Sequence, residues 1–128
     1  MNKLKVSIIT VCRNSEKTIA QTIESVLNQS YDHVEYILID GNSTDHTVDV
    51  IHSYEERFLQ KGYSYFYQSE PDEGIYDAMN KGIKMASGQL VGLINSDDWY
   101  EPTAIEHAVR YYQETPYDLF YADLRIVG

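Results

Sequence analysis

The chain has 128 residues, enough for one domain with a single core, and carries a formal net charge of −10. That charge argues against nonspecific binding to nucleic acid or to an anionic membrane surface, because both of those partners are negative as well. A single cysteine excludes an intrachain disulfide and fits a reducing compartment, and no stretch approaches the roughly 20 apolar residues that a transmembrane segment needs.

Two strand–helix units are predicted in the first half of the chain. Residues 6–11 are β-branched and almost continuously apolar, as expected for a strand covered on both faces. Residues 17–28 carry apolar positions at helical spacing, and residues 36–39 predict a second buried strand. A second helix follows a polar turn, with one face marked by Val48, Ile51, Phe58 and Leu59.

The second half continues the alternation. Residues 63–67 predict a third strand that tolerates an exposed edge because it is rich in tyrosine. A helical stripe ends at Gly88, which is interpreted as a left-handed terminator, and a strand over residues 90–94 follows. A helix begins near Pro102, and a last strand covers residues 119–121. The stripe before Gly88 consists of Ile75, Met79, Ile83 and Ala86.

Strands that alternate with helices of ten or more residues imply crossover connections. We therefore predict an α/β fold with a mainly parallel sheet flanked by helices. Parallel strands point their carboxyl ends at one edge of the sheet, where ligands bind. Polar clusters at residues 12–14, 40–45 and 95–98 follow the first, second and fourth strands, so they should meet at this edge.

Asp97 and Asp98 are adjacent carboxylates, which repel each other and resist desolvation. Two hard oxygen donors in a row suit Mg²⁺ or Mn²⁺, especially where a diphosphate completes the coordination shell. The alternative is that the pair caps the helix near Pro102, but a cap needs only one acid. We predict a metal site at Asp97 and Asp98.

Asp40 directly follows three apolar strand residues, and its carboxylate can accept hydrogen bonds from a base imide or a sugar hydroxyl. Gly41 would allow a ligand to approach closely. The alternative is an ordinary strand-to-helix turn, because residues 41–45 are rich in turn and cap formers.

Residues 69–82 form the least typical segment. Gly82 lies inside a predicted helix at a cost in helix propensity, which indicates close packing or a nearby ligand. Asp77, Asn80 and Lys81 occupy adjacent turns of this helix and are candidate ligand contacts. The alternative is a solvated face beside a tight helix contact.

Four segments, in this order, resemble family 2 glycosyltransferases of the Rossmann-like GT-A fold. They are residues 6–11, 39–45, 74–82 and 95–99, so the resemblance covers nearly the whole chain. It implies that residues 1–128 form a donor-binding domain for a nucleotide diphosphate sugar, such as a UDP-sugar, and for Mg²⁺ or Mn²⁺.

The resemblance also implies roles for single residues. Val11 and Arg13 match the loop beside the nucleotide base, and Asp40 matches the acid that recognises base or ribose. Asp97 and Asp98 match an acidic D-x-D-type site for ribose, diphosphate and metal. The predicted nucleotide-sugar contacts are Val11, Arg13, Asp40, Asp77, Asn80, Lys81, Asn95, Ser96 and Asp97.

Three positions depart from the family pattern. Asn95 stands where many relatives have the first acid, which bears on metal affinity. Gly41 replaces a frequent second acid, which bears on base selectivity. Met79 occupies a position that is often arginine, a loss for which Lys81 compensates in this interpretation.

Family members normally continue into a second half with the acceptor site and the general base. Asp123 comes too early to match that base, so we assign no catalytic residue and expect the base beyond Gly128. By resemblance, the complete enzyme transfers the sugar with inversion to a glycan or lipid-linked hydroxyl in polysaccharide biosynthesis. A cytoplasmic protein, peripheral at the inner face of the membrane, is expected, and this part alone should bind its donor better than it transfers the sugar.

A noncatalytic α/β module that binds a cation, such as a receiver-like signalling domain, is the alternative from another class. It expects an acid pair after the first strand, a phosphoacceptor after the third and a late lysine. The polar clusters of this chain follow strands one, two and four instead.

Overall fold

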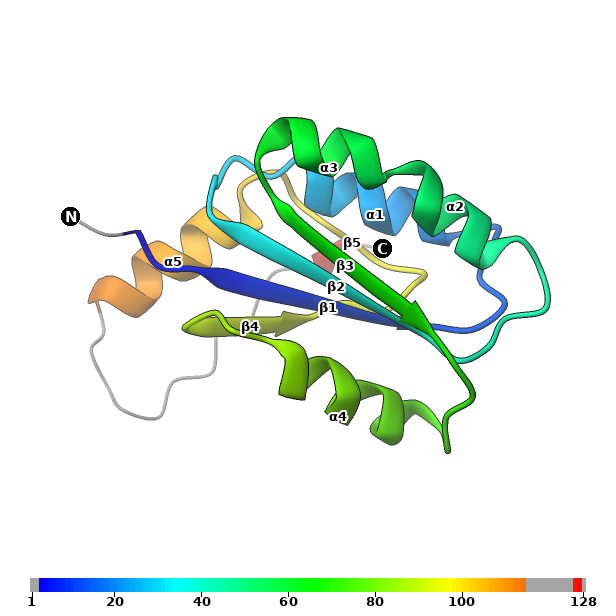
Figure 1. Ribbon diagram of the computed structural model, residues 1–128. Helices are drawn as coiled ribbons and strands as arrows, with labels where there is room; N and C mark the ends of the chain where they lie inside the picture. The colour runs from blue at the N-terminus through cyan, green and yellow to red at the C-terminus, as the bar shows by residue number, and fades with distance from the viewer. Residues whose placement is uncertain (1–2, 115–125, 128) are drawn as a thin grey trace.

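The computed structural model describes residues 3–114 and 126–127 (Figure 1). Strands and helices alternate along most of the chain, as the sequence predicts. In order they are β1 (Val6–Cys12), α1 (Ile19–Leu27), β2 (Val34–Asp40), α2 (Thr47–Ser53), α3 (Glu55–Lys61), β3 (Ser64–Ser69), α4 (Ile75–Met85), β4 (Leu90–Leu93), β5 (Trp99–Tyr100), α5 (Ala104–Glu114) and β6 (Ile126–Val127).

Four strands form one parallel sheet in the order β3-β2-β1-β4. β1 lies between β2 and β4, which explains why it is buried almost throughout. The chain steps outward from β1 to β3, and α4 then carries it back across the sheet to β4 on the other side of β1 (Figure 1). β5 and β6 form a separate antiparallel pair.

Helices cover both faces of the sheet. α1, α2 and α3 lie over one face and α4 lies over the other (Figure 1). The larger core contains Ile8, Tyr36, Leu38 and Phe58, which are fully buried, and α5 adds Ile105 to it. The predicted α/β fold with a mainly parallel sheet is therefore confirmed.

α4 packs on its face of the sheet through small residues. Ala78 and Gly82 are buried, and a Cβ atom at position 82 would lie 2.5 Å from Cγ2 of Ile9. Ile75 and Ile83 are 54% and 47% exposed, so the predicted apolar stripe was wrong. The isoleucines of β1 and β2 fill the space under the helix, and this leaves room for small side chains only.

The second predicted helix is in fact two short helices, α2 and α3. Tyr54 lies between them, and its N–H donates to the carbonyl oxygen of Ile51, three residues back. This tightened turn shifts the phase of the apolar face. Phe58 stays in the core, but Leu59 is 64% exposed, contrary to the prediction.

β3 and β4 are the outer strands of the described sheet. β3 is partly exposed, as its tyrosines predict. β4 is covered on one face only, because Val91 and Leu93 are exposed while Leu90 is buried.

Gly88 does not terminate a helix in the left-handed conformation. α4 ends at Met85, and Gly88 approaches β1 so closely that a Cβ atom would lie 2.6 Å from the carbonyl oxygen of Lys5. The strand predicted over residues 119–121, like Asp123, falls outside the described residues. In the part of the chain that the structure describes, no helix has the length and apolar character to cross a membrane.

Candidate functional site

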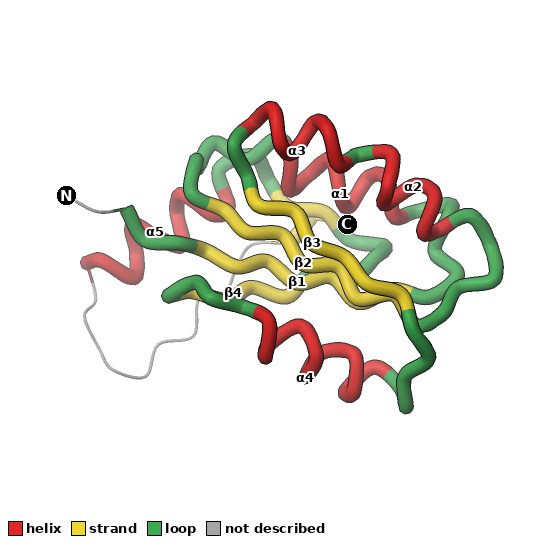
Figure 2. Tube along the Cα trace, in the orientation of Figure 1, coloured by secondary structure: helices red, strands yellow, loops and turns green. Residues whose placement is uncertain are grey.

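The loops that follow the parallel strands gather at one end of the sheet (Figure 2). Hydrogen bonds join them to one another. The N–H of Asn14 donates to Oγ of Ser43, and the N–H of Thr44 donates to Oδ1 of Asn14, both at 2.8 Å. The hydroxyl oxygens of Ser15 and Ser96 lie 2.9 Å apart. The loops after β1, β2 and β4 therefore form one continuous surface, as the sequence predicts.

A cavity of about 870 Å³ opens at this edge. Its volume falls in the range of sites that bind small ligands, about 300–1,000 Å³. It lies beside β1 and β4, the neighbouring strands at which the chain order of the sheet reverses, and ligands bind at such points in α/β sheets. The lining consists of residues 11–18, Asp45, Asp72, Gly74, Ile75, Ala78 and residues 95–97.

Charged side chains of both signs line the cavity. The cations are Arg13 and Lys17, which are exposed and form no ion pair with another described residue. The carboxylates outnumber them, four against two, and are Glu16, Asp45, Asp72 and Asp97. A phosphate group would meet unpaired cations here, and the negative surplus favours a bound metal cation as well.

These carboxylates differ in how many hydrogen bonds they accept from other residues of the protein. Oδ1 of Asp45 accepts the N–H and the hydroxyl of Thr47, at 2.9 and 2.5 Å, and so holds the turn into α2. Glu16 accepts the N–H of His46 at 3.3 Å. Asp97 is exposed and has no hydrogen-bond or ion-pair partner among the described residues. It is therefore free to bind a ligand.

Asp98, the second predicted metal ligand, does not line the cavity. Its Oδ2 lies 3.4 Å from Nδ2 of Asn95, and its carbonyl oxygen accepts the hydroxyl of Thr22 at 2.6 Å. No cluster of three or more His, Cys, Asp or Glu residues within the described ranges could hold a metal ion. The donor set fits Mg²⁺ or Mn²⁺ only where phosphate oxygens and water complete the coordination shell.

Asp40 is 1% exposed and does not line the cavity. Its Oδ2 accepts the N–H of Ser43 at 2.8 Å and the hydroxyl of Ser69 at 2.7 Å. Its Oδ1 accepts the hydroxyl of Ser43 at 2.5 Å and lies 3.5 Å from Sγ of Cys12. The carboxylate thus joins the ends of β1, β2 and β3, and it accepts its hydrogen bonds from groups of the protein itself.

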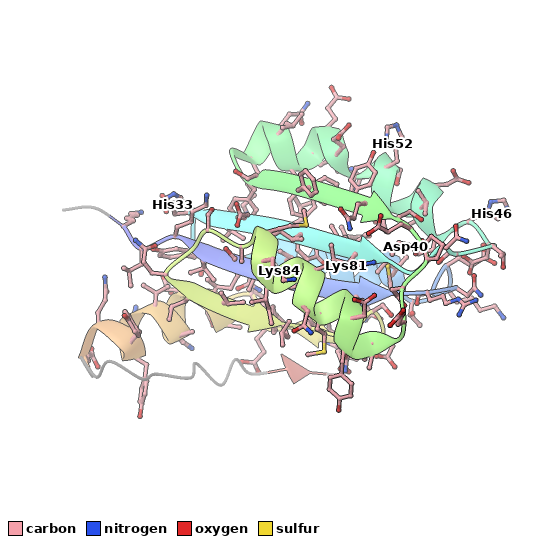
Figure 3. The ribbon with its side chains drawn as sticks, turned by 60° about the horizontal axis from the view of Figure 1, so that its bottom comes forward. His33, Asp40, His46, His52, Lys81 and Lys84 are labelled. Carbon is pink, nitrogen blue, oxygen red and sulfur yellow. The ribbon has the colours of Figure 1, made fainter. Side chains whose placement is uncertain are left out.

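The predicted polar face of α4 holds a loop in place. Lys81 points from α4 toward the carboxyl end of the sheet, near Asp40 (Figure 3). Its Nζ lies 3.0 Å from Oε1 of Glu70 and 3.3 Å from the carbonyl oxygen of Pro71. A hydrogen bond from the backbone N–H of Glu73, together with the charge of Lys81, lowers the pKa of Asp77. These contacts fix the segment between β3 and α4.

The structure separates the predicted site residues into two groups. The cavity is lined by Val11, Arg13, Asn95, Ser96 and Asp97, whereas the lining leaves out Asp40, Asp77, Asn80, Lys81 and Asp98. Two lining residues with free polar groups, Asp72 and Lys17, were missed by the sequence analysis. Asp72 follows the third strand, so the expectation that polar residues gather at the carboxyl edge would have found it there. Lys17 does not directly follow a strand, so the same expectation would not have found it.

A parallel sheet with a polar, partly cationic cavity at its carboxyl edge is typical of α/β proteins that bind small ligands. Residues 7–128 match the family model described as glycosyl transferase family 2, and the chain belongs to this family. The family resemblance and the GT-A fold predicted from the sequence are confirmed. This match also weighs against the receiver-like alternative.

The chain is similar to parts of longer proteins. An uncharacterized glycosyltransferase of Mycobacterium tuberculosis, Rv1514c, is 41% identical over 106 residues, which are 81% of this chain and 38% of that protein. The chain therefore spans less than half the length of this relative.

Two solved structures share the fold. S. aureus TarS 1-349, in complex with UDP-GlcNAc, matches with a TM-score of 0.77 at 24% identity over 87% of this chain and 32% of that chain. The mannosyltransferase PcManGT from Pyrobaculum calidifontis, in complex with GDP-Man and Mn²⁺, matches with a TM-score of 0.77 at 21% identity over 88% of this chain and 33% of that chain.

Proposed function

We propose that this chain binds the nucleotide diphosphate sugar donor of a glycosyltransferase, a UDP-sugar above all, together with Mg²⁺ or Mn²⁺. The observation that carries the proposal is the cavity at the carboxyl edge of the sheet, where the free carboxylate of Asp97 lies with the unpaired cations Arg13 and Lys17. Membership of glycosyl transferase family 2 supports it. So do the nucleotide sugars bound by TarS and PcManGT, two proteins with the same fold.

The lining residues suit different parts of such a donor. Arg13 and Lys17 would offset the charge of the diphosphate, and Val11 offers an apolar surface to the base. Asp97, with Asp98 on the same turn, would hold the cation, which when bound neutralises charge on the departing diphosphate. Asn95 and Ser96 supply an amide and a hydroxyl for hydrogen bonds to the sugar phosphate.

The polar residues outside the lining would act indirectly. Asp40 holds the loops after β2 and β3, because Ser43 and Ser69 donate to its carboxylate. Asp77 and Lys81 hold the segment that leads into α4. Asn80 is exposed on the same helix, where it remains a predicted donor contact.

For the reaction itself, we propose transfer with inversion. An acceptor hydroxyl loses its proton to a general base and attacks the anomeric carbon on the side opposite the diphosphate, while the bond from that carbon to the diphosphate oxygen breaks. We assign no such base among the described residues and place it in the acceptor-binding half of the longer relatives. This chain alone should therefore bind its donor better than it transfers the sugar. The acceptor would be a glycan or a lipid-linked hydroxyl in polysaccharide assembly at the inner face of the membrane.

Isothermal titration calorimetry tests the donor site. We expect UDP to bind with Mn²⁺ present, and Mn²⁺ alone to bind at least about tenfold more weakly, because the protein lacks a complete metal shell. Asp97→Asn keeps the shape of the side chain but removes its charge, and it should cost about tenfold or more of the metal-dependent affinity. Asp49→Asn, an equal charge change at an exposed site on α2, is the matched control and should bind as wild type.

Two results would contradict the proposed function. One is wild-type protein that binds neither UDP nor GDP when Mg²⁺ or Mn²⁺ is present. The other is an Asp97→Asn variant whose nucleotide affinity still rises with metal as much as that of the wild type.

A further inference from the structure

The carboxylate of Asp72 packs directly against the backbone of Gly41, the residue that follows β2. A Cβ atom at position 41 would lie 2.7 Å from Oδ2 of Asp72 and 3.4 Å from its Cγ. Real side chains do not tolerate contacts this short, so any residue other than glycine would push the Asp72 carboxylate away. The missing side chain at position 41 and the carboxylate from position 72 therefore form a complementary pair.

Asp72 is held in this position by its surroundings. Its Oδ1 accepts the N–H of Gly74 at 3.1 Å. The segment before it is fixed at both sides, because the N–H of Glu70 donates to the carbonyl oxygen of Asp40 at 3.1 Å and Lys81 binds Glu70 and the carbonyl of Pro71. Oδ2 of Asp72, in contrast, has no partner in the described ranges, and the side chain lines the cavity.

Asp72 and Asp97 line the cavity from different strands of the sheet. Asp72 contacts the end of β2, whereas Asp97 follows β4, and β1 lies between these two strands. The backbones of β2 and β4 are two strand spacings apart, about 10 Å. On the proposed function, the cation lies at the β4 side of the cavity, which leaves Asp72 for a different part of the ligand.

Asp40 cannot serve that part of the ligand directly. Its carboxylate is buried and already accepts four hydrogen bonds, from the backbone and hydroxyl of Ser43, the hydroxyl of Ser69 and the thiol of Cys12.

Asp45, in the loop after β2, also lines the cavity, but both oxygens of its carboxylate accept hydrogen bonds, from Thr47 and from the N–H of Glu16. Asp72 is therefore the carboxylate beside the end of β2 that lines the cavity and keeps one oxygen without a partner among the described residues.

We propose that Asp72 determines recognition of the nucleoside half of the donor, by accepting a hydrogen bond from a base N–H or a ribose hydroxyl, and that Gly41 is required to seat it. This inference rests on the proposed function, which places the diphosphate and its cation near Asp97. A donor long enough to reach from Asp97 past β1 presents its nucleoside at Gly41. An ionised carboxylate accepts from N–H and O–H groups, and it disfavours ligands that lack a donor there.

Substitution of Asp72 tests the hydrogen bond. Asp72→Asn keeps the size of the side chain, and Glu73→Gln makes the same charge change one residue further along, outside the cavity lining. With UDP or GDP, whichever binds wild type, and Mn²⁺, calorimetry should show about tenfold or greater loss of affinity for Asp72→Asn. Glu73→Gln should bind as wild type, and both variants should keep the wild-type melting temperature.

Nucleotide analogues separate recognition from a purely structural role. The wild type should discriminate against a nucleotide that lacks the donated proton, either the form methylated at the base imide or amide nitrogen or the 2′-deoxy form. Asp72→Asn should lose most of the discrimination against that analogue. If the variant discriminates against both analogues as strongly as wild type does, Asp72 does not read the nucleoside.

Gly41→Ala tests the pairing. In the wild-type background it should weaken nucleotide binding, because the new Cβ atom displaces Asp72. In the Asp72→Asn background it should add little, since the two changes remove the same interaction and their effects are then not additive. Equal losses in both backgrounds would show that Gly41 acts independently of Asp72 and would overturn the pairing.

Failure of this inference is distinguishable from failure of the proposed function. Wild-type protein that binds no nucleotide diphosphate with metal contradicts both. Wild-type protein that binds, beside an Asp72→Asn variant that matches Glu73→Gln in affinity, contradicts the role of Asp72 and leaves the donor site in place.

Discussion

At Asp40 and Cys12, the ends of two neighbouring strands meet in a buried polar contact. Sγ of Cys12 lies 3.5 Å from the carboxylate, which also binds the hydroxyls of Ser43 and Ser69. These contacts support the cavity lining, because Cys12 lines the cavity while Asp40 is buried and does not. Substitution of Asp40 would therefore act on ligand binding through the loops that it holds.

The same contact predicts an unreactive cysteine. Burial, and then the adjacent negative charge of Asp40, raise the pKa of the Cys12 thiol well above its usual range. A raised pKa keeps the thiol protonated at pH 8, and the thiolate is the form that reacts. We expect iodoacetamide to alkylate native protein at least about tenfold more slowly than urea-unfolded protein, as followed by mass spectrometry. Equal rates in the two states would contradict this account of Cys12.

At the residue scale, the sequence identifies which loops form the site better than which side chains face it. Arg13 and Asp97 are exposed and line the cavity, and each follows its strand in a loop at the carboxyl edge of the sheet. Asp40 also follows a strand in sequence, but it is buried, and its carboxylate accepts a hydrogen bond from Ser69, which is distant along the chain. Asp72 follows the third strand at the same edge, so its place at the cavity could have been predicted, but its contact with Gly41 is brought about only by the folded chain.

At the scale of elements, the position of α4 depends on the absence of a side chain at Gly82. Gly82 lets the helix approach β1 until Ile9 would touch any added Cβ atom, at 2.5 Å. That approach brings the first turn of α4, with Gly74 and Ala78, to the cavity wall. The spacing of apolar residues predicts the helix but not its buried face, since helix periodicity assumes that large residues face the core. Here strand residues supply the volume instead.

Gly82→Ala measures this close packing. Alanine improves helix propensity by about 1 kcal/mol, whereas overpacking costs about 1–3 kcal/mol. We expect a net loss of about 1 kcal/mol in the free energy of unfolding, as determined by urea denaturation. Asn80→Ala, at an exposed position of the same helix, should be neutral or slightly stabilising. A more stable Gly82→Ala protein would show that the helix does not rely on this contact.

At the scale of the whole molecule, the order of the strands places the site. The alternation of strands and helices is enough to predict a parallel sheet with polar loops along one edge. The order β3-β2-β1-β4 is not visible in the sequence pattern, because it depends on α4 crossing to the far side of β1. That crossing puts the loop after β4 beside the loop after β1, where the hydroxyls of Ser15 and Ser96 meet.

The location of the donor can be measured directly by NMR. Amide shifts of ¹⁵N-labelled protein, recorded during titration with UDP and Mg²⁺, report which part of the sheet binds. We predict that the largest changes fall on residues 13–18, 72–75 and 95–97, which line or adjoin the cavity. Changes centred instead on the opposite end of the sheet, where Lys5 pairs with Glu35, or no changes at saturating ligand, would contradict a donor site at this edge.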